Sequence, residues 1–171
     1  MRYLFDSDVL INAKNFHYNP KFCPEFWDWI VAGHNAGLMF SIDKVRDELL
    51  NGKKDDPLYG WAKADALEKF FLNSKPATAK WSQLSQWAND PKRGYFEAAK
   101  VKFLDDDSAD AWLIAVAAHE GDFRIITNEV HRPESKRDIK LPDAAAALGV
   151  KTIALHEVLA LHARPGFKFE P

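Results

Sequence analysis

Four carboxylates stand where apolar segments of the chain begin or end, and their placement suggests chemistry: Asp6, Glu48, Asp110 and Glu129. Asp6 and Glu129 each follow a short apolar run that is typical of a buried strand. Open parallel α/β sheets bind ligands just past the carboxyl ends of their strands. Carboxylates gathered without basic partners repel one another, and cations usually neutralise them. Four acids in one cleft would therefore bind a divalent metal ion, Mg²⁺ or Mn²⁺.

A metal ion of this kind favours one class of reaction. It polarises a phosphodiester, lowers the pKa of a bound water molecule and stabilises the leaving oxygen. Metal-dependent hydrolysis of phosphoesters is therefore the leading interpretation.

The first acid is one of a pair, Asp6 and Asp8, on either side of Ser7. Along an extended chain, at most one of the two can point into the cleft at the sheet edge, and Asp6 is the better candidate. Asp8 can instead cap a helix that begins near Val9, and it is kept as a second candidate metal ligand.

The second and third acids lie on predicted helices. In a helix over 43–50, Glu48 flanks the apolar stripe that holds Val45 and Leu49, so it can reach a buried cleft. In a helix over 108–119, the spacing predicts that Asp107 and Asp110 share the inward face. Capping of the helix explains Asp107 more easily than it explains Asp110.

The fourth acid closes the triplet Thr127, Asn128 and Glu129, which follows a predicted strand over 123–127. A hydroxyl, an amide and a carboxylate thus meet at the edge of the sheet where ligands bind. Thr127 and Asn128 are candidate substrate contacts, although turn chemistry alone can explain Asn128.

The alternation of predicted strands and helices favours one three-layer α/β/α domain over residues 1–171, with a central parallel sheet. Within it, a helical insert is predicted over about 73–104. The periodic segment 61–71 is predicted to be helical, and the tail 164–171 is predicted to be a loosely docked end.

Composition gives fewer constraints. The formal net charge is −2, whereas nucleic-acid-binding proteins commonly carry a basic excess, but a cluster of metal-binding acids could conceal such an excess. No apolar run is long enough to span a membrane, and the first residues do not form a secretory signal, so we expect a cytoplasmic protein. Basic residues, among them Lys14 and Arg46, could line a track for phosphates.

The order of the acids resembles the PIN domain family of metal-dependent nucleases, and in particular a bacterial subgroup of uncharacterised PIN-like proteins. The segments that carry the resemblance are 3–11, 45–49, 109–115 and 125–129, with 22–29 and 140–150 for the subgroup. The resemblance covers nearly the whole chain and is weaker over 73–104. It implies a parallel sheet of five strands, and it makes the four acids the catalytic metal ligands, with Asp8, Asp107 and Asn128 as second-tier candidates for the metal site.

The resemblance also implies an endoribonuclease that uses Mg²⁺ or Mn²⁺, acts on single-stranded RNA and is frequently the toxin of a toxin–antitoxin pair, often as a homodimer. Two positions depart from the family pattern. Glu129 stands where Asp is more frequent, which lengthens the reach by one methylene, and Asp8 stands where Asn is common, which adds charge.

Two alternatives to a nuclease stay open. In a haloacid-dehalogenase-type phosphatase, Asp6 would be the nucleophile and Asp8 the acid/base, but that pattern requires Thr or Val where this chain has Leu10. A catalytically silent binding module would keep the fold and lose the metal. Zinc is disfavoured, because His156 and His162 are six residues apart and a helical zinc pair needs four.

Overall fold

The computed structural model describes residues 1–171, and at its centre is a sheet of five parallel strands. In chain order the strands are β1 (Arg2–Phe5), β2 (Met39–Ile42), β3 (Phe71–Leu72), β4 (Phe123–Ile126) and β5 (Lys151–Ile153). Their order across the sheet is β3-β2-β1-β4-β5, so β1 lies in the middle. This arrangement confirms the predicted α/β/α fold with a parallel sheet of about five strands.

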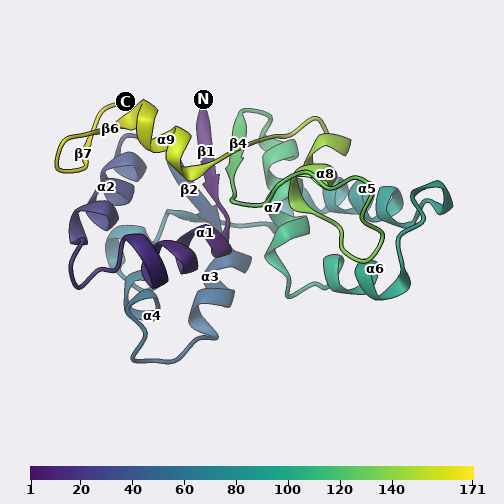
Figure 1. Ribbon diagram of the computed structural model, residues 1–171, viewed down its shortest axis with the longest axis horizontal. Helices are drawn as coiled ribbons and strands as arrows, with labels where there is room; N and C mark the ends of the chain where they lie inside the picture. The colour runs from purple at the N-terminus through teal and green to yellow at the C-terminus, as the bar shows by residue number, and fades with distance from the viewer.

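Helices cover both faces of the sheet, with α1, α2 and α9 on one side and α5, α7 and α8 on the other (Figure 1). The α-helices are α1 (Ser7–Asn12), α2 (Pro24–Asn35), α3 (Asp43–Leu50), α4 (Pro57–Ala62), α5 (Thr78–Asn89), α6 (Glu97–Phe103), α7 (Ala109–Glu120), α8 (Leu141–Ala147) and α9 (Leu155–His162). Short helices of other types are η1 (Ala13–His17), η2 (Asp65–Leu67), η3 (Lys75–Ala77) and η4 (Pro91–Arg93). No helix is long and apolar enough to span a bilayer.

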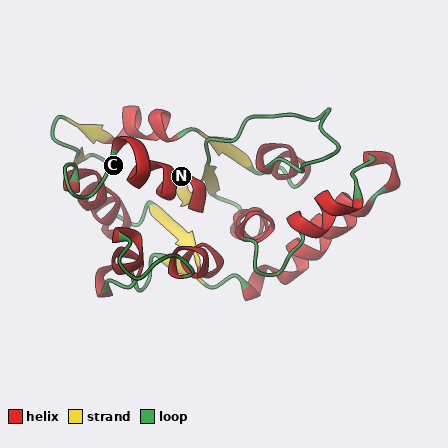
Figure 2. Ribbon diagram, turned by 60° about the horizontal axis from the view of Figure 1, so that its bottom comes forward, coloured by secondary structure: helices red, strands yellow, loops and turns green.

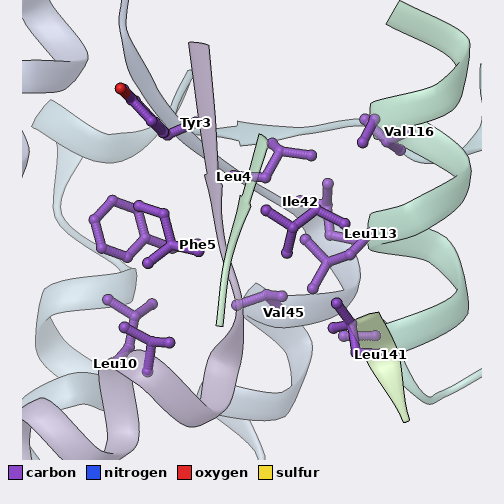
Figure 3. Packing of buried hydrophobic residues seen from close by; sticks show 14 of the residues in the cluster. Tyr3, Leu4, Phe5, Leu10, Ile42, Val45, Leu113, Val116 and Leu141 are labelled. Atoms are coloured by element: carbon purple, nitrogen blue, oxygen red, sulfur yellow. The ribbon is translucent and has the colours of Figure 1, made fainter. Parts of the chain in front are cut away.

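The central strand explains why the first residues of the chain are continuously apolar. Side chains alternate across a strand, so Tyr3 and Phe5 point toward α1 and α2 while Leu4 points toward α7. Figure 3 shows Leu4 beside Leu113 and Val116 of α7. All of these side chains are buried. A parallel strand covered on both faces needs such an uninterrupted apolar run rather than alternation with polar residues.

Helix α7 is the main support of the second face. Its residues from Ala111 to Ala117 are all buried, and it packs against β2, β4, α5 and α8. Gly121 ends the helix in the left-handed conformation, with φ of 85°, which glycine adopts without steric cost. Because α7 leads directly into β4, its N-terminus lies at the carboxyl edge of the parallel sheet.

The insert predicted over about 73–104 is helical, since it contains α5 and α6 together with η3 and η4. Figure 2 shows its helices at the end of the molecule away from the C-terminal hairpin. The prediction of a helix over 61–71 is wrong in part. The segment contains the end of α4, then η2, and it closes with the edge strand β3.

The prediction of a loosely docked tail is also wrong. Residues after α9 form an antiparallel hairpin of β6 (Ala163–Arg164) and β7 (Lys168–Phe169). Phe167 and Phe169 pack against the core, and the indole N–H of Trp29 donates to the carbonyl of His162 over 3.1 Å. The tail therefore covers the end of α2, where aromatic contacts outweigh its polar composition.

Candidate functional site

The candidate site lies where the connections leave the sheet in opposite directions. From β1 the chain goes to β2 on one side, whereas β4 leads to β5 on the other, so a crevice opens between the carboxyl ends of β1 and β4. Asp6 follows β1 and Thr127 follows β4. The backbone N–H of Asp6 donates to the carbonyl of Ile126 over 3.2 Å, which brings the two strand ends together.

The carboxylate of Asp6 is held on both of its oxygens. Oδ1 accepts the backbone N–H of Asp8 over 3.3 Å as the N-cap of α1, and Oδ2 accepts the hydroxyl of Thr127 over 3.0 Å. The cap of this helix is therefore Asp6 and not Asp8. The same Thr127 hydroxyl accepts the backbone N–H of Glu129 over 3.2 Å, so it links the first and last acids.

Burial is the main influence on the protonation of Asp6, which is only 3% exposed. Burial, and then the charges of Asp110 and Asp8, raise its pKa from 3.8 to about 8, against the opposing effect of the Thr127 hydrogen bond. No lysine or arginine pairs with this carboxyl group. A cation in the crevice would relieve both the desolvation and the repulsion.

Asp110 occupies the second position of α7 and is half-buried. Burial and then the charges of Glu129, Glu48 and Asp8 raise its pKa from 3.8 to about 7, while Lys102 acts in the opposite direction. The four predicted acids thus lie close enough to affect one another electrostatically. The structure brings together the residues that the sequence pattern singled out.

Glu48 and Glu129 have a second function, because each binds the N-terminus of a helix. Oε1 of Glu48 accepts the backbone N–H of Ala109 over 2.9 Å, at the start of α7. Oε2 of Glu129 accepts the backbone N–H of Leu141 over 2.8 Å, at the start of α8. The N-cap residues of α7 and α8 make no side-chain capping bond of their own. The two glutamates, which are remote in sequence from these N-caps, therefore accept the free N–H groups instead.

The four acids are not arranged as a closed metal site. The structure shows no group of three or more His, Cys, Asp or Glu side chains already positioned around one metal ion. Asp6 and Asp110 form no salt bridge, whereas Glu129 also pairs with Lys140 over 3.2 Å. The donor set consists entirely of carboxylate oxygens, which suits Mg²⁺ or Mn²⁺, and one or two carboxylates with several water molecules are enough to hold Mg²⁺.

A pocket of about 50 Å³ opens between α7, the loop after β4 and α6, with room for an ion and a few water molecules. Asp110 and Glu129 line it together with two lysines, Lys102 and Lys140. The sequence analysis did not single out these lysines. Lys140 stands directly before the Leu-Pro start of α8, which was an available signal, whereas Lys102 lies on an exposed helix and gave none.

The second-tier acids are placed differently from each other. Asp8 is exposed, but its charge acts on both Asp6 and Asp110, so it faces the site. Asp107 is exposed in the turn before α7, which begins at Ala109. The expectation that Asp107 shares the inward helix face with Asp110 is therefore wrong, since Asp107 is not in the helix.

Of the four predicted substrate contacts, two lie at the site and two lie elsewhere. Thr127 is buried at the centre of the site, and Asn128 is exposed beside it. Lys14 instead pairs with Asp56 over 2.6 Å, and Nε of Arg46 donates to the carbonyl of Ala62 over 3.0 Å. Both basic side chains hold the two ends of α4 in place, and neither lines the acidic pocket.

Residues 3–164 match the family described as "Domain of unknown function (DUF4411)", and the chain therefore belongs to that family. Comparison with curated proteins and with solved structures gave no significant match.

Proposed function

We propose that this chain is a metal-dependent endoribonuclease that hydrolyses phosphodiester bonds of single-stranded RNA. The observation that carries the proposal is the pair Asp6 and Asp110, two carboxyl groups at the switch point of a parallel sheet with strongly raised pKa values and no salt-bridge partner. Such a pair is unfavourable in the folded protein unless it serves a ligand. An ion-pair network does not explain it, because neither carboxyl group forms a salt bridge and the charges that raise the two pKa values are all negative.

The residues fit a site for Mg²⁺ or Mn²⁺ in their chemistry. Asp6, Asp110, Glu48 and Glu129 would supply the oxygens, with Asp8 as a further candidate. When bound, the metal ion would polarise the phosphodiester and lower the pKa of the attacking water molecule, so that products carry a 5′-phosphate and a 3′-hydroxyl.

The remaining side chains have roles that follow from their contacts. The Thr127 hydroxyl orients Asp6, and the N–H groups of Asp8 and Ala109 orient Asp6 and Glu48. Lys102 and Lys140 bring positive charge into the acidic pocket, where a substrate phosphate would also lie. Phosphate oxygens bind ammonium groups through charge-assisted hydrogen bonds.

The resemblance to PIN domains supports a finer version of the proposal, in which the chain is the cytoplasmic toxin of a toxin–antitoxin pair and forms homodimers. In that case a small antitoxin gene lies beside the gene for this chain, and induction of the chain alone arrests growth. An isolated gene and normal growth would point to RNA processing or repair.

A cleavage assay tests the reaction. Purified protein should cleave single-stranded RNA with Mn²⁺ or Mg²⁺, stop in EDTA, and lose about 10³-fold or more of its rate in Asp6→Asn and Asp110→Asn. Asp107→Asn is the matched control, because Asp107 is an exposed carboxylate outside the helix. Metal-dependent release of phosphate from a monoester, with RNA intact and an aspartyl-phosphate trapped on Asp6, would instead establish a phosphatase.

A further inference from the structure

A second hollow lies beside the acidic site, between η1 and α9. Its volume of about 420 Å³ is in the range of sites for small organic ligands. The hollow has an apolar floor, an aromatic rim and flanking amides. Val9, Leu155 and Leu159 form the apolar floor. Phe16 and His17 form the aromatic rim, and Asn12 and Asn128 supply the amides. We call this hollow the aromatic groove.

Two residues that line the aromatic groove are sequence neighbours of residues of the acidic site. Val9 directly follows Asp8, and Asn128 stands between Thr127 and Glu129. Asn128 also lines a neighbouring hollow that Glu129 shares. A molecule bound in the groove would therefore lie next to the reacting position at the crevice between β1 and β4.

The lining of the groove carries no permanently charged side chain, and its only titratable imidazoles are those of His17 and His156. No carboxylate, lysine or arginine contributes to it, in contrast to the acidic pocket. Flat aromatic rings provide a stacking surface, and amides and imidazoles provide donors and acceptors. This combination matches a nucleobase, which has two apolar faces and a hydrogen-bonding edge, and does not match a phosphate.

The side chain of Phe16 at the rim is exposed, although the backbone segment that carries it is held against the core. Phe16 is 67% exposed, on a π-helix, a form that occurs frequently at functional sites. Its neighbour Tyr18 stacks on Phe26 with ring centroids 4.4 Å apart, and the Tyr18 carbonyl accepts the indole N–H of Trp27 over 2.7 Å. The segment therefore presents an apolar ring to solvent from a fixed position.

We propose that the aromatic groove binds one unpaired base of the RNA substrate, next to the phosphodiester that is cleaved, with Phe16 stacking on that base. The proposal rests on the function proposed above and adds a subsite to it. It predicts a preference for single strands, because a base within a duplex is stacked and paired and does not reach the groove.

The test is binding in EDTA, where no cleavage occurs, with two labelled probes: a short oligoadenosine and an abasic oligonucleotide of the same length. Phe16→Ala should weaken binding of oligoadenosine about tenfold and leave binding of the abasic probe unchanged. Phe16→Trp should retain the affinity. Phe22→Ala is the matched control, because Phe22 is 68% exposed and does not line the groove.

An equal loss on both probes, or no loss on oligoadenosine, would overturn the proposal. Dissociation of an oligomer by Phe16→Ala, with base binding intact, would also overturn it and identify the groove as a protein contact. Cleavage in Mn²⁺ separates the two proposals. Metal-dependent cleavage that does not depend on Phe16 rejects the subsite alone, whereas Phe16-dependent base binding without cleavage rejects the nuclease and keeps the base site.

Discussion

The carboxyl group of Asp6 should make stability depend on pH. Its pKa is raised to about 8 by burial and by Asp110 and Asp8, above the 3.8 of an unfolded chain. Its contribution to stability is therefore fully present below about pH 4 and is lost as pH rises through 8, because the unfolded state releases this proton first. Urea midpoints of wild-type protein in EDTA should include a component that falls over this range.

Asp6→Asn should remove that component, since the amide keeps an oxygen for the Thr127 hydroxyl and carries no charge. The variant should gain stability relative to wild type as pH rises above about 4, and the gain should be much larger at pH 9 than at pH 5. Asp107→Asn is the control for a general effect of charge. Parallel pH profiles for wild type and Asp6→Asn would show that Asp6 does not titrate as described.

Metal ions should reverse the same destabilisation. A ligand that binds only the native state stabilises by mass action, and Mg²⁺ or Mn²⁺ binds ionised carboxylates. The gain in Tm at millimolar metal should therefore be larger at pH 8 than at pH 6, and Asp6→Asn should abolish most of it. Equal gains in melting curves of the two proteins would remove Asp6 from the site.

The position of two of the acids in the site could be predicted because they follow apolar strands in the sequence. The position of Lys102 and Lys140 could not, because it depends on contacts between segments far apart in the chain. Asp6 and Glu129 follow apolar runs, so their location at the sheet edge could be inferred from the chain alone. Lys140 gains its role only because Glu129 lies 3.2 Å away, eleven residues earlier in the chain. Side-chain pairing of this kind depends on rotamers that no local pattern encodes.

At the scale of elements, α7 depends on a residue of another helix. The N–H of Ala109 at its start donates to Glu48 of α3, while Ser108 makes no capping bond. Glu48→Ala should therefore cost about 1 kcal/mol of stability, and Glu48→Gln should cost less, because its amide oxygen still accepts the N–H.

The two substitutions separate the structural role of Glu48 from its proposed role toward metal. Urea unfolding in EDTA measures the cap, and the increase in Tm with Mn²⁺ measures the ligand. Glu48→Gln should retain most of the stability while losing part of the metal response. A Gln variant with an unchanged metal response would leave Glu48 with the cap alone.

Strand β3 shows why one element escaped prediction. It has only two residues, Phe71 and Leu72, and it follows Ala64, Leu67 and Phe70, whose spacing of three is typical of one face of a helix. The backbone N–H of Ser41 donates to the carbonyl of Phe70, so pairing with β2 fixes the segment as an edge strand. Tertiary pairing overrides local periodicity in so short an element.

The whole molecule is closed by its C-terminal hairpin, which joins segments from both ends of the chain. The hydroxyl of Tyr3 in β1 lies 3.0 Å from Nε2 of His162, and the carbonyl of Glu170 lies 2.9 Å from its Nδ1. The ring of Phe169 stacks on His162 at 5.9 Å. These contacts cover the end of the sheet opposite to the acids, because Tyr3 precedes Phe5 and Asp6 along β1.

Deletion of residues 163–171 should therefore destabilise the protein without altering the site. Loss of the partly buried rings of Phe167 and Phe169 should cost about 2–3 kcal/mol, measured as a lower urea midpoint. The increase in Tm with Mn²⁺ should keep its size, since none of the acids contacts the hairpin. Arg164→Ala in the full chain is the control, because it removes an exposed ion pair with Glu170 and an exposed hydrogen bond to the carbonyl of Ala163, and it should cost under about 1 kcal/mol. A truncated protein that keeps full stability would show that the hairpin adds no net stabilisation. A truncated protein that loses only its metal response would connect the hairpin to the site.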